Sequence, residues 1–298
     1  MAKRKVNSYN ILDRYTWFVP GVADIFILLL WLLIGAFIGS IAQLVFTLAL
    51  GTDTGMEYAM IISYPIMFLP AMIYASVKSR SNSFTKTGVK LDSPHFGSKG
   101  GLICALLVVV STIALSFCTD AINSLMPEMP AWLEEALTSM TSGEIWVDLL
   151  CVSIFAPFFE EWLCRGMVLR GLLGKGIKPI WAIILSALFF AVIHANPWQA
   201  VPAFILGCFF GYVYYKTGSL KLTMLMHCAN NTFAVICSHL DCFEEVESWT
   251  DALPGMQYWI IFGAALLLII LTVNHFSKID LQSPKGNCDE VPSIFEEQ

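Results

Sequence analysis

Long apolar runs separated by short polar segments make up most of the chain. Eight of these runs approach or exceed the roughly 20 residues that a helix needs to cross a bilayer. Their predicted bounds are 24–50, 57–77, 100–121, 146–170, 179–195, 198–216, 219–240 and 256–276. The pattern therefore predicts an all-α fold, a polytopic membrane helical bundle with about eight transmembrane helices.

Composition supports a single membrane domain. Of the 298 residues, 57% are hydrophobic and only 13% are charged, whereas a soluble domain has roughly 25% charged residues. We expect a cytoplasmic N-terminal segment (1–23), a membrane domain (24–276) with a motif-bearing core at about 145–240, and an acidic, disordered cytoplasmic tail (277–298). Gly35 and Gly39, four residues apart in the first run, predict close helix packing.

Basic residues fall almost entirely on one side of the predicted membrane. With the N-terminus in the cytoplasm, cytoplasmic segments hold all of the 17 lysines and arginines except Arg165. The four outer segments contain neither residue type; they are 51–56, 122–145, 196–197 and 241–255. This positive-inside bias predicts cytoplasmic N- and C-termini. A multi-pass protein of a bacterial plasma membrane fits these features.

Two adjacent glutamates, Glu160 and Glu161, lie deep in the fourth run. A charge within the bilayer costs at least ~2.5–3.5 kcal/mol on insertion scales, so such residues are functional candidates. Neighbouring helical residues point about 100° apart, which gives the two carboxylates separate roles. Glu161 and Arg165 share a helix face and can form an ion pair. Glu160 has no partner on its own helix and suits general-base work. For Glu161 and Arg165, a structural salt-bridge network is the alternative.

Three further polar residues occur in later runs. His194 lies near the end of the fifth run, where a lone histidine is more often structural than catalytic. His227 and Asn231 are four residues apart in the seventh run, so both can donate hydrogen bonds to one point and polarise a carbonyl group. Interhelical hydrogen bonding is the structural alternative for this pair.

Together, these residues form a set suited to hydrolysis, with a base, a group that orients it and an oxyanion site. Glutamate and histidine are also zinc ligands. The HExxH spacing is absent, so a zinc site would have to be assembled across helices. A serine nucleophile in a GxSxG elbow is absent as well. The nine cysteines include no CxxC pair and predict no disulfide framework.

The motifs resemble those of the CPBP family of intramembrane proteases. This family includes type II CAAX prenyl endopeptidases, bacteriocin-processing proteins and Abi-like immunity proteins, and its signature is EExxxR, FxxxH and HxxxN. The corresponding residues here are Glu160, Glu161 and Arg165, then Phe190 and His194, then His227 and Asn231. Their order and separations match the family pattern. The resemblance covers roughly 145–240, about a third of the chain.

The resemblance implies a role for the motif residues. Glu160 and His194 would activate a water molecule. His227 and Asn231 would stabilise the oxyanion of the tetrahedral intermediate. The family is labelled as metalloprotease, but a metal-free glutamate mechanism is also argued for it. A bound Zn²⁺ would take Glu160, His194 and His227 as ligands, and the sequence favours neither mechanism.

The remaining motif residues, Glu161 and Arg165, would hold the geometry of the site. The predicted function is therefore an intramembrane endopeptidase, an EC 3.4 hydrolase that cuts a membrane-associated, prenylated or leader peptide. Its partners would be a peptide or protein substrate and the lipid bilayer. The net charge of −6 argues against nucleic acid. The alternatives are a non-enzymatic docking or immunity protein on the same fold, and a proton-coupled transporter, because buried Glu and His also form proton relays.

Overall fold

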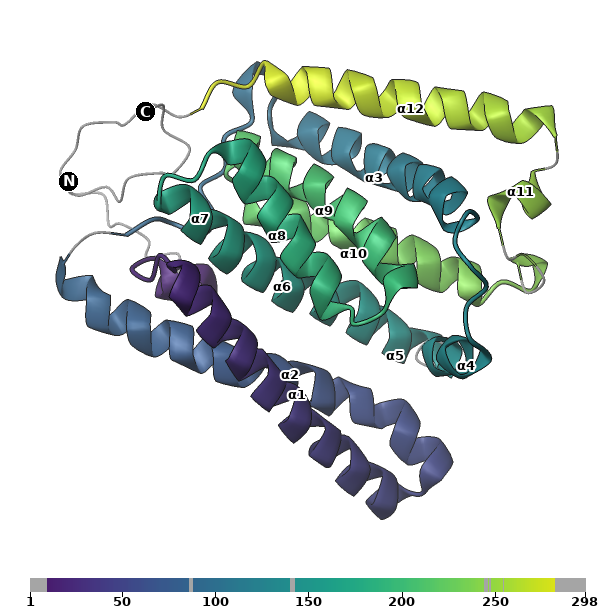
Figure 1. Ribbon diagram of the computed structural model, residues 1–298, viewed down its shortest axis with the longest axis horizontal. Coiled ribbons are helices and arrows are strands. Elements are labelled where there is room, and N and C mark those ends of the chain that lie inside the picture. The colour runs from purple at the N-terminus through teal and green to yellow at the C-terminus, as the bar shows by residue number, and fades with distance from the viewer. Residues whose placement is uncertain are drawn as a thin grey trace, which may run out of the picture.

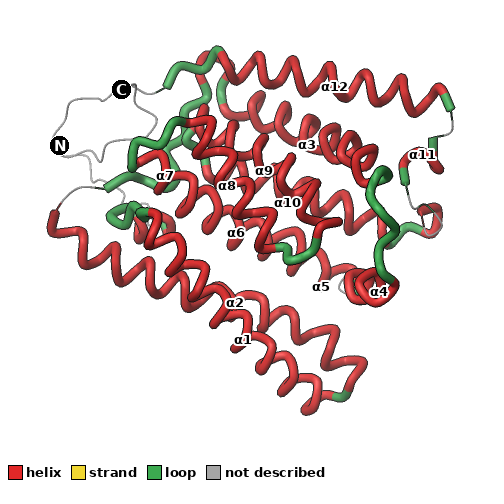
Figure 2. Tube along the Cα trace, viewed as in Figure 1, coloured by secondary structure: helices red, strands yellow, loops and turns green. Residues whose placement is uncertain are grey.

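The computed structural model describes residues 10–85, 88–139, 143–243, 246, 248–253 and 255–281. Most of the tail predicted to be disordered (282–298) lies outside these residues, as do residues 1–9 of the N-terminal segment. Every regular element within the described part of the chain is a helix, and Figure 2 draws no strand. The all-α fold predicted from the sequence is confirmed.

Twelve α-helices carry the architecture of the described residues (Figure 1). They are α1 (Val22–Leu50), α2 (Thr52–Asn82), α3 (Gly101–Asn123), α4 (Ala131–Ser139), α5 (Ile145–Leu150), α6 (Ala156–Glu161), α7 (Arg170–Gly174), α8 (Pro179–Ile193), α9 (Pro197–Thr217), α10 (Leu220–Ser238), α11 (Trp249–Ala252) and α12 (Met256–Ser277). Two π-helical segments, η4 (Cys151–Phe155) and η5 (Trp162–Leu169), join α5, α6 and α7 into one continuous helical segment. Short 3₁₀ turns are η1 (Ile11–Tyr15), η2 (Ser83–Thr85), η3 (Gly97–Lys99) and η6 (Asp241–Phe243).

Among the described residues, four helices are long and apolar enough to cross a membrane by length and composition alone. They are Val22–Leu50, Tyr58–Asn82, Gly101–Asn123 and Met256–Ser277. Their outward side chains are large and apolar, as Phe37 and Leu48 show with 69% and 77% exposure. Water would penalise such a continuous apolar surface, whereas lipid accommodates it. The chain is therefore a polytopic helical membrane protein.

The motif-bearing segment 145–174 lies at the centre of the bundle. Every residue from Glu161 to Leu173 is buried, because helices before and after it in the chain pack around it. The hydrophobic core surrounds this segment and includes Trp162, Leu163 and Met167. Few of its side chains face lipid, which is why it can carry Glu160, Glu161 and Arg165 in the interior of the bundle.

Helices α1 and α2 form an antiparallel hairpin beside the other helices (Figure 1). A Cβ atom on Gly35 would overlap the carbonyl oxygen of Met67, and one on Gly39 would lie 2.9 Å from the carbonyl oxygen of Ser63. The close helix packing predicted from these glycines is confirmed, and the partner is the next helix of the same chain.

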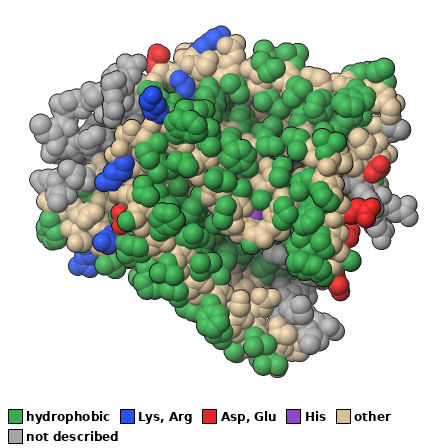
Figure 3. Space-filling model, viewed as in Figure 1, with side chains coloured by type: hydrophobic (Ala, Val, Ile, Leu, Met, Phe, Trp, Pro, Cys, Tyr) green, Lys and Arg blue, Asp and Glu red, His purple; other side chains and the backbone are tan. Residues whose placement is uncertain are grey.

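Basic residues gather at one end of the bundle. In Figure 3, Lys and Arg side chains gather at the end where α7 and the last turn of α12 lie, and none is visible at the end that holds α4 and α11. Arg170, counted among the cytoplasmic basic residues, is fully buried, and its guanidinium donates to the carbonyl oxygens of Gly166, Val89 and Phe18.

Candidate active site

The two glutamates lie on the short helix α6, between the π-helical segments η4 and η5. A π-helical turn holds more residues than an α-turn and rotates the faces of the helix, and such turns are frequent at functional sites. Glu161 and Arg165 form the predicted ion pair, with 2.6 Å between Oε1 and Nη1, and both side chains are fully buried. This pairing confirms that the two glutamates have different surroundings.

Arg165 joins α6 to two further helices. Its Nη2 donates to the carbonyl oxygen of Gly207 on α9 at 3.0 Å. Its guanidinium also lies over the rings of Phe190 and Phe210, at 4.7 and 5.3 Å from the ring centroids. These contacts combine an ion pair, a hydrogen bond and two cation–π interactions. They hold Glu161 in one place.

His227 on α10 lies between the two glutamates. Its Nδ1 is 3.1 Å from Oε1 of Glu161, and its Nε2 is 3.8 Å from Oε2 of Glu160. A carboxylate only accepts hydrogen bonds, so Nδ1 carries the proton of this contact. The Nε2 atom is thereby turned toward Glu160, at a separation wider than a hydrogen bond. A single water molecule or substrate group can therefore contact both Nε2 of His227 and Oε2 of Glu160.

Glu160 receives a hydrogen bond from a residue that the sequence analysis missed. The hydroxyl of Tyr64 on α2 donates to Oε1 of Glu160. The other oxygen, Oε2, is buried and has no hydrogen-bond partner among the described residues. As predicted, Glu160 has no partner on its own helix, and its hydrogen-bond partner comes from α2 instead. A tyrosine in an apolar run resembles an ordinary membrane aromatic, so the sequence carried no distinguishing signal.

The amide of Asn231 is oriented by a chain of hydrogen bonds. Its Nδ2 donates to the carbonyl oxygen of Val152 at 2.8 Å, and its Oδ1 accepts from Nδ2 of Asn230 at 3.1 Å. Because a carbonyl only accepts, this contact fixes which end of the Asn231 amide is the nitrogen. That nitrogen has a second hydrogen available for a ligand.

His194 follows the last residue of α8. Its Nδ1 lies 2.8 Å from the carbonyl oxygen of Phe190. The Phe190 ring makes edge contacts with His194 and with His227, at centroid distances of 4.9 and 5.5 Å. The described contacts therefore connect His194 to the glutamate network through Phe190, and within the described residues no hydrogen bond or ion pair joins His194 directly to Glu160.

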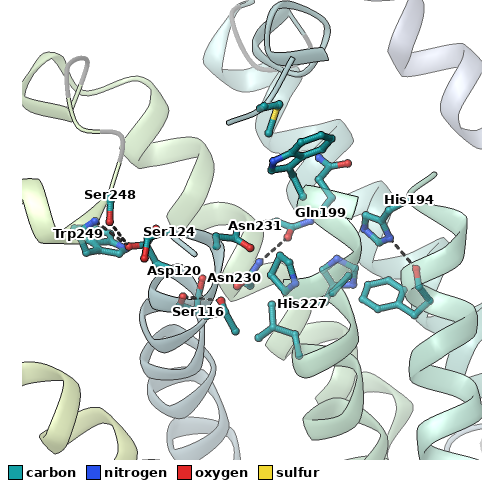
Figure 4. Close-up of a pocket in the computed structure, with 18 of the residues that line it drawn as sticks. Ser116, Asp120, Ser124, His194, Gln199, His227, Asn230, Asn231, Ser248 and Trp249 are labelled. Carbon is teal, nitrogen blue, oxygen red and sulfur yellow. Dashed lines mark hydrogen bonds between the residues drawn. The ribbon is translucent and has the colours of Figure 1, made fainter. Parts of the chain in front are cut away.

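A cavity of about 720 Å³ holds the two histidines and the paired asparagines (Figure 4). Its wall comes from α3, α8, α9, α10 and α11 and from Met129. His227 lines this cavity and also approaches Glu160, so it connects the cavity with the glutamates. The sequence analysis did not assign the lining residues Asp120, Asn123 and Asn230 to the site. The only hint in the sequence was for Asn230, because it is next to the motif residue Asn231.

Zinc coordination requires several ligand atoms at about 2.0–2.3 Å from one ion. Glu160 and His227 approach each other at 3.8 Å, but the described residues contain no group of three His, Cys, Asp or Glu side chains arranged to hold a metal ion. The expected ligands Glu160, His194 and His227 are not assembled as a set. The residues therefore do not fit a zinc site in this arrangement.

The fold and the site together define a helical membrane protein with glutamate, histidine and asparagine side chains gathered inside the bundle. Residues 142–233 match the family model described as type II CAAX prenyl endopeptidase Rce1-like. All three motifs lie within this range, which confirms the resemblance predicted from the sequence. The match covers about a third of the chain, and it supports a region similar to this CAAX-protease family. No curated protein and no solved structure matched the chain.

Proposed function

We propose that the protein is an intramembrane endopeptidase that hydrolyses a peptide bond of a membrane-associated substrate with a glutamate-activated water molecule. The observation that carries this proposal is the approach of Glu160 Oε2 and His227 Nε2 to 3.8 Å, with His227 in the wall of the cavity. A base and a polar group can thus act on the same carbonyl. The family match supports a protease at the coarser level.

In the proposed reaction, Oε2 of Glu160 accepts a proton from water while the water oxygen attacks the carbonyl carbon of the substrate. Asn231 Nδ2 donates its second hydrogen to the developing oxyanion, and the His227 ring adds a second donor from Nε2 when that ring is protonated. Glu160 then delivers its proton to the leaving nitrogen. The carbon–nitrogen bond breaks to give one carboxyl and one amine product.

The supporting residues keep these groups in position. Glu161 accepts from His227 Nδ1 and is itself held by Arg165. The 3.8 Å approach of His227 to Glu160 favours His227 over His194 as the histidine next to the proposed base. We retain His194 as a cavity residue that contacts the substrate or assists proton transfer.

The charge asymmetry of the bundle supports a multi-pass orientation with the basic end in the cytoplasm. In that orientation the cavity, which α11 and the end of α3 border, lies toward the outer side of the membrane. A bacterial plasma membrane suits this arrangement.

The proposal is tested by product chemistry. Purified protein in detergent is incubated with a pool of peptides in water enriched in ¹⁸O, and products are identified by mass spectrometry. Hydrolysis predicts paired fragments with ¹⁸O in the new carboxyl group, formed by the wild type and not by Glu160→Gln. A parallel sample with a strong chelator and a metal assay decides whether a metal ion takes part. Fragments formed equally by both proteins would count against the assignment and favour a docking protein.

A further inference from the structure

The cavity beside His227 is lined by acidic and neutral polar groups. Asp120 and Asp251 are its carboxylates, and no lysine or arginine is found among the described residues of its wall. Arg165 lies behind Phe190 and Phe210, whose rings line the cavity, and it is paired with Glu161. Its charge is therefore neutralised and separated from the cavity by aromatic rings. Among the described residues of the wall, only the two histidines can carry a positive charge.

Two side-chain amide oxygens of the wall receive no hydrogen bond from the described residues. The hydrogen bond from Asn231 to the carbonyl of Val152 fixes the Asn231 amide, and this in turn makes Asn230 the donor to Asn231. The Oδ1 atom of Asn230 is thereby left as an acceptor. This atom and Oδ1 of Asn123 are buried without a hydrogen-bond partner in the part of the chain that the structure describes. Buried acceptors without donors are costly, so a ligand rich in N–H groups is favoured here.

Asp120 also has capacity for a ligand. Its two described hydrogen bonds, from Ser248 Oγ at 2.8 Å and from the backbone N–H of Trp249 at 3.0 Å, both go to Oδ2. Figure 4 shows Asp120 on α3 beside Ser248 and Trp249, in the same cavity as His227 and Asn230. A cationic group inside the cavity would meet this carboxylate.

The residues around the cavity are negatively charged, like the carboxylates in its wall. The sequence segments 122–145 and 241–255 contain no Lys or Arg. Their described residues at this end of the bundle include Glu128, Glu134 and Asp241. In Figure 3, the acidic side chains at this end are not accompanied by basic ones. A field of one sign raises the local concentration of oppositely charged ligands and speeds their association.

We propose that the cavity takes a peptide segment that carries a lysine or arginine close to the scissile bond and that enters from the acidic end of the bundle. This inference rests on the proposed peptidase function and narrows its substrate class. A substrate that ends in a free carboxylate, such as a prenylated CaaX tail, would place its negative charge near Asp120 and Asp251. Such a tail is a poor fit to this cavity.

Binding is measured apart from cleavage, with the full-length Glu160→Gln protein in detergent. Fluorescently labelled peptides of one length differ only in a central pair of residues, which is Lys-Lys, Gln-Gln or Glu-Glu. We expect the Lys-Lys peptide to bind at least about tenfold more tightly than the Glu-Glu peptide at low salt, and this ratio to shrink at high salt because ions screen the charges. A farnesylated peptide with a free C-terminal carboxylate should bind no better than the Glu-Glu peptide.

Substitutions in the cavity wall test whether the preference for the Lys-Lys peptide arises there. Asp120→Asn should reduce the Lys-Lys to Glu-Glu ratio, as should Ser124→Lys, which adds a cation at an exposed position of the cavity wall. The Ser124 variant keeps the test decisive if loss of the Asp120 contacts prevents folding. The matched control is Asp92→Asn at the opposite end, where Asp92 is paired with Lys221, and it should leave the ratio unchanged.

Three results would overturn the proposal. These are equal binding of the Lys-Lys and Glu-Glu peptides, no binding of any peptide, and a preference that neither cavity variant changes. Because binding is measured in a protein without the proposed base, these results are independent of the cleavage test. Charge-selective binding with no hydrolysis by the wild type would retain this inference about the ligand and count against the peptidase function.

Discussion

The hydroxyl of Tyr64 donates a hydrogen bond to Oε1 of Glu160, across the contact between α2 and α6. The stacked rings of Phe68 and Phe159, with centroids 5.2 Å apart, support the same contact between helices. With Oε1 held by Tyr64, the second oxygen of Glu160 is directed toward Nε2 of His227. A residue outside the range matched by the family model thus orients the proposed base.

Removal of this hydroxyl should impair the chemical step. Tyr64→Phe is expected to lower kcat by roughly 10- to 100-fold, since a hydrogen bond to a charged group contributes about 1.5–3 kcal/mol. Because Tyr64 contacts the proposed base and does not line the cavity, KM should change little. Steady-state cleavage of the best peptide from the pool provides both constants.

The matched control is Tyr58→Phe on the same helix, where the ring lies 5.8 Å from that of Trp146. This variant should retain wild-type kcat. If the two tyrosine variants had the same kcat, Tyr64 would have no part in positioning Glu160.

The close approach of α1 and α2 should be sensitive to a single methyl group. Gly35→Ala places a Cβ against the backbone carbonyl of Met67, which cannot move without the helix. We expect a destabilisation of about 1–3 kcal/mol, seen as a lower melting temperature in detergent. Gly263→Ala on α12 is the control, because nothing lies within 4 Å of its Cβ position. Equal melting temperatures for the two variants would contradict the described packing.

The proposed orientation predicts which cysteine reacts from outside the cell. Cys242 is exposed and lies on η6, at the acidic end of the bundle. A membrane-impermeant maleimide should label the protein in intact cells, and Cys242→Ser should abolish that labelling. Labelling that requires permeabilised cells would reverse the orientation and place the cavity toward the cytoplasm.

Much of the fold was readable from the sequence because the bilayer imposes a simple rule on helix length and polarity. All eight predicted runs overlap helical segments. The ion pair of Glu161 with Arg165 was readable too, because four-residue spacing on a helix is a local property. Arg170 shows the limit of such reasoning. Its burial against carbonyl groups from three segments could not be read from its charge or its place in the sequence.

The contacts between distant segments of the site could not be read from the sequence. Tyr64 lies 96 residues before Glu160, and its approach depends on how the α1–α2 hairpin packs. The position of His194 depends on the length of α8, which has 15 residues, and on the packing of Phe190. The roles implied for His194 and His227 therefore depended on the family resemblance, whereas the distances bring His227 to the two glutamates.

The most direct test of the account compares three proteins in one cleavage assay. These are the wild type, Glu160→Gln, and Asp13→Asn as a carboxylate-to-amide control at an exposed position of η1. We predict that Glu160→Gln lowers kcat/KM by at least about a thousandfold, as expected for loss of the base in a glutamate-activated reaction, while its melting temperature and peptide binding remain close to those of the wild type. Asp13→Asn should cleave as the wild type does. Cleavage by Glu160→Gln at the wild-type rate would contradict the claim that Glu160 is the catalytic base.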